Sequence, residues 1–154
     1  MIREGTPRDI PAIAGLRAAW AGEQQGVQVS VGMQYREAFG TWLQANPRTF
    51  FVAEDAAAGP GSTEPPLVGM LNLSIFERMP KPGKPASVWV YLSNAYVLPA
   101  HRNAGVGTEL VSAAIRHARL LGAARIVTSP SPASKSFYAR NGFEPAEELA
   151  VYRF

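Results

Sequence analysis

Apolar residues recur at helical spacing in two windows near the start of the chain. Thr6, Pro7 and Asp9 form a helix-start signal, because Thr caps free amides, Pro fits the first helical position and Asp favours the positive end. One helix is expected after this signal and a second over about 33–45, before Pro47 ends it. The apolar positions that define them are Ile10, Ile13, Ala14, Leu16, Trp20, Tyr35, Phe39, Trp42 and Leu43.

Segments rich in β-branched, aromatic and aliphatic residues predict the strands. Segments 49–53 and 67–76 are expected to pair as a hairpin across a Gly/Pro/Ala loop over 56–66, which holds no core-forming residues. A Pro-rich loop over 77–86 then leads into a long strand over 87–98. Further strands are expected at 2–3, 125–128 and, from alternating apolar and polar residues, 149–154.

Two more helices are expected in the second half of the chain. The longest covers 104–121, with one apolar face and Gly122 as its stop signal. Another begins after Ser131, which precedes a proline and is typical of an N-cap, and ends near Asn141. The resulting order of strands and helices indicates the α/β (α+β) class, with a mixed sheet covered by helices in one domain over 1–154.

The composition removes several classes of chemistry. The chain has 154 residues and no cysteine, which excludes a disulfide framework, a thiolate zinc site and a cysteine nucleophile. Its two histidines, His101 and His117, are too few and too far apart to indicate a metal centre, so no metal is expected.

Charge and hydropathy bear on partners and location. Fifteen basic and twelve acidic residues give a net charge of +3 without a basic stripe, so a nucleic-acid partner is not expected. No stretch approaches the ~18 apolar residues of a membrane span, and the first residues lack the apolar core of a signal peptide. A cytoplasmic protein with no membrane partner is therefore expected.

The segment 102–107, Arg-Asn-Ala-Gly-Val-Gly, lies where a predicted strand gives way to the longest helix. The first amides of a helix have no internal partners and carry a partial positive charge, so they attract an anion such as phosphate. Gly105 and Gly107 allow close approach to this backbone, although tight packing of the helix on the sheet explains them equally well. The absence of a following Lys-Ser or Lys-Thr argues against a P-loop, and the turn comes too late in the chain for a dinucleotide fingerprint.

Two motifs together resemble the GNAT superfamily of N-acetyltransferases. The first is Val97-x-Pro99-x-x-Arg102-x-x-Gly105-x-Gly107, which fits the cofactor pattern Arg/Gln-x-x-Gly-x-Gly/Ala of that family. The second is the run from Ser136 to Glu144, which is similar to the family's "FYxxxGF" element. This resemblance covers nearly the whole chain and implies a mostly antiparallel sheet of about six to seven strands flanked by helices.

The resemblance also implies acetyl-CoA as co-substrate. The amides of 103–108 are expected to bind its pyrophosphate, and the main chain of the preceding strand its pantetheine arm. Where the family often has an asparagine early in the last helix this chain has Ser131, which puts that contact in doubt. The expected cofactor-binding residues are Ala95, Tyr96, Val97, Arg102, Asn103, Ala104, Gly105, Val106, Gly107, Thr108 and Ser131.

By the same resemblance, Tyr138 is the expected catalytic residue, as the general acid near the sulfur of CoA. A core position beside Phe137 and Phe143 is the alternative for its ring. Because the chain lacks cysteine, direct attack of the amine in a ternary complex is the simplest mechanism.

The general base and the acceptor site stay open at this stage. The strand before the turn has no acidic residue, so a water held by Ser93 and Asn94, or else Glu23 or Glu77, are the candidates. The acceptor is expected to be a primary amine of a small molecule or a protein. Residues expected near its entrance are Trp20, Tyr35, Arg78, Lys81 and Lys84.

Two classes of function remain. The first is an acetyl-CoA-dependent N-acetyltransferase, with a homodimer possible by analogy with the family. The second is a non-catalytic acyl-CoA-binding regulatory module, which the missing strand carboxylate keeps open.

Overall fold

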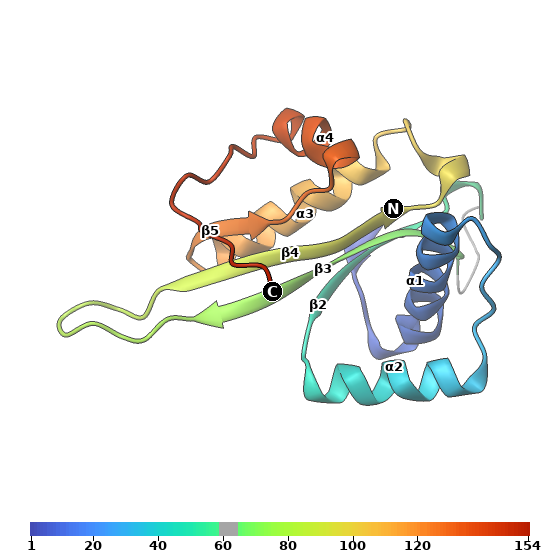
Figure 1. The fold of residues 1–154 in the computed structure, drawn as a ribbon, viewed down its shortest axis with the longest axis horizontal. Helices are drawn as coiled ribbons and strands as arrows, with labels where there is room; N and C mark the ends of the chain where they lie inside the picture. The colour runs from blue at the N-terminus through green and yellow to red at the C-terminus, as the bar shows by residue number, and fades with distance from the viewer. Residues whose placement is uncertain (59–64) are drawn as a thin grey trace.

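A computed structural model describes residues 1–58 and 65–154 and shows a twisted sheet with helices on both faces (Figure 1). Short 3-10 turns occur before α1, after β2, before α3 and before α4. The main elements, in chain order, are β1 (Ile2–Glu4), α1 (Ile10–Gln25), α2 (Met33–Ala45), β2 (Thr49–Glu54), β3 (Leu67–Glu77), β4 (Val88–Val97), α3 (Val106–Leu120), β5 (Ala123–Thr128) and α4 (Lys135–Arg140).

The strands follow chain order across the sheet, β1-β2-β3-β4-β5. The first four are antiparallel to their neighbours, and β5 alone runs parallel to β4. Two neighbouring parallel strands need a long crossover connection. The segment that contains α3 connects β4 to β5, and α3 packs against the sheet. The expected hairpin of 49–53 with 67–76 is confirmed, as is the helix over 33–45.

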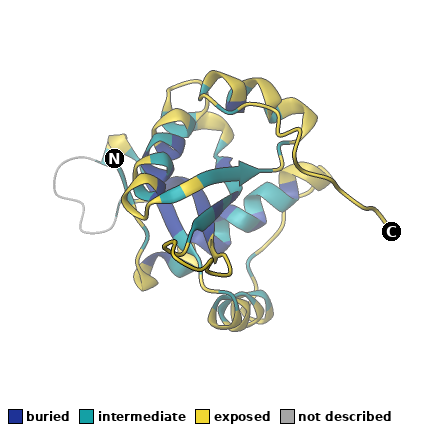
Figure 2. Cartoon of the chain, turned by 90° about the vertical axis from the view of Figure 1, so that its left-hand side faces the viewer, coloured by how far each residue is buried: buried dark blue, intermediate teal, exposed yellow. Residues whose placement is uncertain are grey.

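Two hydrophobic clusters hold the layers together. One joins the sheet to α3 and includes Leu71, Leu92 and Leu110; the other joins the sheet to α1 and includes Ile13 and Met70. Figure 2 shows the buried residues at the centre of the sheet and on the inner faces of the helices, with the outer faces exposed. Since helices cover both faces, the first eight residues of β3 are all buried rather than alternating.

Helix α3 begins two residues later than the sequence predicts, because residues 104 and 105 belong to the turn before it. Its buried face is made by Leu110, Val111, Ala113, Ala114 and Ala118, as expected for an amphipathic helix. Gly122 follows it with a positive φ of 66°, the left-handed conformation that glycine adopts at helix ends.

The prediction of a strand over 149–154 is wrong. These residues form no strand, and Val151 and Tyr152 are exposed, so the sheet has five strands rather than six to seven. Residues with an alternating apolar and polar pattern form a strand only when they pair with the backbone of a neighbouring strand. The only pairing partner of β5 within the described residues is β4, so residues 149–154 do not extend the sheet. An ion pair of Arg125 with Glu148, at 2.7 Å, is the contact that links the start of this tail to β5.

Within the loop expected over 56–66, Ala56–Ala58 form a short 3-10 turn and 59–64 lie outside the described residues. No helix among the described residues is long and apolar enough to cross a membrane.

A buried carboxylate fixes the start of α1 to the sheet. Both terminal nitrogens of Arg3 donate to Asp9 at 2.8 Å, and Thr6 adds its amide at 2.7 Å and its hydroxyl at 2.9 Å. Arg3 also donates to Glu54 at the end of β2. The Arg3 guanidinium and the Thr6 donors hold the pKa of Asp9 well below its usual range, so this carboxylate stays charged at neutral pH.

We expect Asp9→Asn to lower the free energy of unfolding by about 1–3 kcal/mol at neutral pH, since it weakens several hydrogen bonds to one buried carboxylate. A depressed pKa contributes stability above the unfolded-state value of about 4, and this contribution is lost as the pH falls through the folded-state value. The stability difference between wild type and variant, measured by urea unfolding, should therefore narrow below about pH 4. A difference that does not change with pH would contradict this account.

Candidate active site

An irregularity in β4 creates the main cavity of the molecule. Met70 of β3 faces Tyr96 and Asn72 faces Ser93, so two steps along β3 correspond to three along β4. The extra residue is a β-bulge, and Asn94 has a positive φ of 52° there. Asparagine tolerates this left-handed conformation better than most residues with a side chain.

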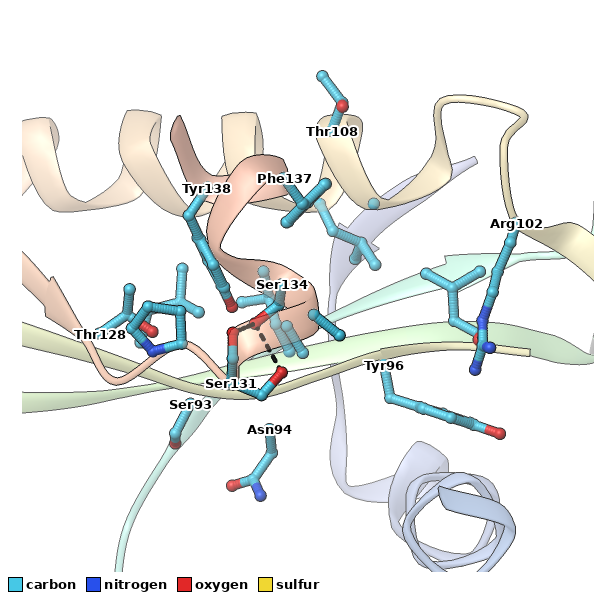
Figure 3. Close-up of a pocket in the computed structure, with 18 of the residues that line it drawn as sticks. Ser93, Asn94, Tyr96, Arg102, Thr108, Thr128, Ser131, Ser134, Phe137 and Tyr138 are labelled. Atoms are coloured by element: carbon cyan, nitrogen blue, oxygen red, sulfur yellow. Dashed lines mark hydrogen bonds between the residues drawn. The ribbon is translucent and has the colours of Figure 1, made fainter. Parts of the chain in front are cut away.

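Strand β5 ends beside the start of the bulge in β4. Their parallel pairing ends at Leu92 and Thr128, and beyond it the strands enclose a cavity of about 810 Å³ (Figure 3). The end of β4 lines one side of this cavity, and the segment from Thr128 to Ser134 lines the other. The main chain of the last residues of β4 therefore faces a cavity instead of a neighbouring strand.

The turn before α3 closes one end of the cavity with free amides. Among the described residues, no carbonyl accepts a backbone hydrogen bond from the amides of 103–108, and the first paired amide is that of Glu109, which donates to Gly105 at 3.0 Å. Asn103 and Gly105 have positive φ values of 63° and 85°. These unpaired amides lie at the positive end of a 15-residue helix, which is the arrangement that favours an anion.

The two glycines of the turn have different roles. A Cβ on Gly105 would meet nothing within 4 Å, so its need for glycine is conformational and the space before it is open. A Cβ on Gly107 would lie 3.2 Å from the ring of Phe137, so this glycine lets α4 pack against α3. The close packing at Gly107 is therefore between two helices, whereas the sequence-based alternative was packing between a helix and the sheet.

Arg102 is held by α1 rather than left free. Its terminal nitrogens donate to Glu23 at 2.8 and 2.7 Å, and its Nε donates to the carbonyl of Val97 at 2.9 Å. Tyr96 donates its hydroxyl to the same carboxylate at 3.1 Å. Arg102 holds the pKa of Glu23 below its usual range, which makes Glu23 a weak base and a positioning group for the turn.

Tyr138 contributes to both the core and the cavity. It is only 7% exposed, and its ring packs edge-on against Phe137 and Phe143 with centroids 5.2 and 5.3 Å away. Its hydroxyl points into the cavity (Figure 3). Burial raises the pKa of Tyr138, so the phenol keeps its proton at neutral pH and is able to donate it.

Uncharged polar residues surround the bulge: Ser93 and Asn94 line the main cavity, and Asn72 and Asn94 line a second one on the α1 side of β4. Ser93 donates to Asn72 at 2.8 Å, and Asn72 donates to Asn94 at 2.9 Å. The hydroxyls of Ser131 and Ser134 lie 3.0 Å apart, so Ser131 uses its side chain for Ser134 and not for the predicted cap. No carboxylate lines the cavity in the described part of the chain.

Most of the residues predicted for the cofactor site meet at this cavity. Two of the predicted set, Ala104 in the turn and Val106 at the start of α3, do not line the cavity. Those that line it are Ala95, Tyr96, Val97, Arg102, Asn103, Gly105, Gly107, Thr108 and Ser131, and the predicted catalytic residue Tyr138 lines it as well.

The residues predicted near the acceptor entrance do not lie together in the structure. Trp20 lines the main cavity and Tyr35 a second one, whereas Arg78, Lys81 and Lys84 line neither and lie in or next to the exposed hairpin between β3 and β4. Glu77, opposite Val88 at the far end of β4, is likewise not a lining residue. Within 1–58 and 65–154, no group of three or more His, Asp or Glu side chains is placed to hold a metal ion.

Sequence reasoning missed Asn72, Thr128 and Ser134. Asn72 lies in an apolar strand and is brought to Ser93 and Asn94 only by the sheet register. Both hydroxyl residues are weakly indicated in the sequence. Ser134 lies three residues after the predicted cap Ser131, and Thr128 is the last residue of a predicted strand.

Residues 17–143 match the model of the acetyltransferase (GNAT) family. The chain belongs to this family. The observed topology, with the β4 bulge and the free amides before α3, therefore describes the GNAT fold as this sequence builds it. None of the curated protein sequences compared with the chain matches it.

Solved structures share the GNAT fold over the full length. An acetyltransferase from Trypanosoma brucei is 17% identical, with a TM-score of 0.73 over 100% of this chain and 99% of that one. AAC(6')-Iy, in complex with the bisubstrate analogue CoA-S-monomethyl-acetylneamine, is 24% identical, with a TM-score of 0.70 over 100% and 97%. A predicted acetyltransferase with acetyl-CoA, from Clostridium acetobutylicum, is 16% identical, with a TM-score of 0.71 over 99% and 95%.

The bulge of this GNAT chain is testable through Asn94. Asn94→Gly and Asn94→Val both remove the hydrogen bond from Asn72, but only the valine opposes a positive φ. We expect the valine variant to be less stable than the glycine variant by about 1–2 kcal/mol in urea unfolding. Equal stabilities would show that the left-handed backbone at this position is not required.

Proposed function

We propose that this chain is an acetyl-CoA-dependent N-acetyltransferase that transfers the acetyl group directly to a primary amine. The observation that carries the proposal is the cavity between β4 and β5, which ends at the unpaired amides of 103–108. Its shape suits a long ligand with an anionic diphosphate at one end. The CoA-containing ligands of structures that share the fold support the same donor.

The chain offers matching groups for each part of CoA. The amides of 103–108 and the positive end of α3 bind the diphosphate, and the open space at Gly105 admits it close to the backbone. Beyond the bulge, the main-chain groups of Ala95, Tyr96 and Val97 that β3 does not use pair with the amides of the pantetheine arm, although the carbonyl of Val97 already accepts from Arg102. Arg102 keeps the turn in place through Glu23, so its contribution to binding is indirect.

The transfer requires three things of the protein. Acetyl-CoA supplies an acyl group activated as a thioester, and the amine attacks its carbonyl carbon, so that a C–N bond forms and the C–S bond breaks. Tyr138 gives its phenolic proton to the departing sulfur, since its raised pKa keeps it protonated. The chain has no cysteine, which rules out a cysteinyl intermediate and leaves direct transfer as the simplest route.

The proton of the amine needs a separate acceptor. No carboxylate lines the cavity within the described residues, and Arg102 keeps Glu23 in its weakly basic charged form. We assign this step to a water bound by the polar group of Ser93, Asn72 and Asn94, from which the proton passes to solvent. The same lack of a lining carboxylate favours the second candidate function, a non-catalytic acyl-CoA-binding module.

Gly105→Ala tests the diphosphate site. The variant places a side chain at a φ of 85° and reorients the amides of the turn, so we expect affinity for CoA to fall at least about tenfold by calorimetry. Gly83→Ala is the matched control, because Gly83 has a φ of 70°, open space around it and a position in the distant β3–β4 hairpin. Equal CoA affinities in the two variants, or no CoA binding by the wild type, would refute the proposed site.

Tyr138→Phe tests the general acid. We expect kcat to fall about 100-fold, while affinity for CoA changes little, because the ring still fills its place between Phe137 and Phe143. In the wild type, kcat should fall only at a pH above the usual range of a phenol, because burial raises the pKa of Tyr138, and the variant should lack this limb. Tyr152→Phe in the exposed tail is the control.

CoA release measured across a panel of amines supplies these rates. Turnover that survives in Tyr138→Phe would remove this assignment. Binding of CoA by the wild type without turnover on any amine would favour the regulatory module.

A further inference from the structure

A second cavity, of about 280 Å³, lies on the α1 and α2 side of the sheet. Tyr35, Phe39 and Trp42 of α2 form an aromatic wall, with neighbouring ring centroids 6.0 and 6.3 Å apart. Strands β3 and β4 contribute Asn72 and Asn94 to the opposite wall. No residue of α2 is fully buried, so this wall is held mainly by its contact with α1.

Arg17 of α1 is the single charged residue among those that line this cavity. Its Nη1 is buried and has no hydrogen-bond partner in the described part of the chain. Two other arginines have acidic partners, since Arg3 binds Asp9 and Glu54, and Arg102 binds Glu23. A buried donor without an acceptor is costly, so this chain maintains at Arg17 a group that its own residues do not complete.

The stacking of Arg17 does not use its donors. Its guanidinium carbon lies 4.8 Å from the centroid of the Trp20 ring. A cation–π contact does not consume hydrogen-bond donors, and the N–H groups of a guanidinium form a fork that fits a planar carboxylate. Trp20 therefore orients the fork without occupying it.

We infer that Arg17 binds a carboxylate of the amine acceptor in this second cavity. The inference rests on the proposed function, because it treats the cavity as the acceptor site of the transferase. A single guanidinium in aromatic surroundings balances one negative charge. A carboxylate has one, whereas a doubly charged phosphate leaves a second charge uncompensated in an apolar cavity.

Asn94 places this cavity next to the donor site. It lines both cavities, and its side chain lies on the α1 side of β4, opposite Tyr138 (Figure 3). An acceptor whose carboxylate is held by Arg17 thus extends past the bulge, with its apolar part against Phe39 and Trp42 and its amine near the main cavity. The substrate class is a small amino acid-like amine with an apolar body.

The test compares matched acceptors. A series of free amino acids with increasing spacing between amine and carboxylate, together with phenylalanine, is assayed against the corresponding carboxamides by CoA release. We expect kcat/KM to be at least about tenfold higher for a carboxylate than for its amide, since charge-assisted hydrogen bonds are lost in the amide. In Arg17→Met this ratio should fall to about one, and Arg17→Lys should keep part of it.

Arg48→Met is the control variant. Arg48 also stacks on an aromatic residue of the cavity, Trp42, at 5.1 Å, but does not line the cavity itself, so the ratio should persist. Thermal unfolding and CoA affinity of every variant show that it is folded. Binding of phenylalanine and phenylalaninamide to the CoA-loaded protein, followed by tryptophan fluorescence, gives a second readout that needs no turnover.

Three outcomes would overturn the inference: equal kcat/KM and equal binding for carboxylates and amides in the wild type, a ratio that survives Arg17→Met, or stronger binding of the phosphonate analogue of phenylalanine. Each leaves the proposed function intact when CoA still binds and is released with other amines. Failure of the wild type to bind CoA, in contrast, removes the proposed function itself.

Discussion

The fold and the site depend on one extra residue in β4. β5 ends at Thr128, opposite Leu92, whereas β4 continues to Val97. The residue added around Asn94 bends β4 after Leu92, and the edge of its last residues that faces away from β3 has no strand neighbour and is available to a ligand. The hydrophobic clusters on both faces keep β4 attached to β3 and to the helices, and this allows the opening to exist without loss of the core.

Backbone and side chains divide the work at this opening. In the proposed function, binding of an anion falls to the main-chain amides before α3, because Arg102 is already paired with Glu23. That pairing neutralises two charges near the turn and leaves the helix end as the main source of positive potential. Tyr138 has its ring in the core and its hydroxyl in the cavity, so packing fixes the direction in which the phenol donates.

Local patterns predict the helices, the hairpin and the glycine turn, since spacing of apolar residues and the conformational needs of glycine act over a few residues. The bulge has no such signal: Ser93, Asn94 and Ala95 continue an ordinary strand, and only the register against β3 reveals the insertion. Contacts between distant segments are equally hidden, as with Glu23 and Arg102, 79 residues apart. Residues 149–154 show the opposite failure, in which a local pattern has no matching structure. Their apolar and polar residues alternate as in a strand, but they pair with no strand of the sheet.

Four side chains are stacked between the two cavities. Arg17 lies over Trp20, Trp20 is stacked on Tyr96 with centroids 6.0 Å apart, and Arg102 lies 5.5 Å from the centroid of Tyr96. This column joins the second cavity to the turn before α3, beside the hydrogen bonds that Glu23 accepts from Tyr96 and Arg102. Loss of the Trp20 indole would remove the support of Arg17 directly and that of Arg102 through Tyr96, so kinetic defects in such a mutant would look like poor recognition of two unrelated ligands although a single ring had been removed.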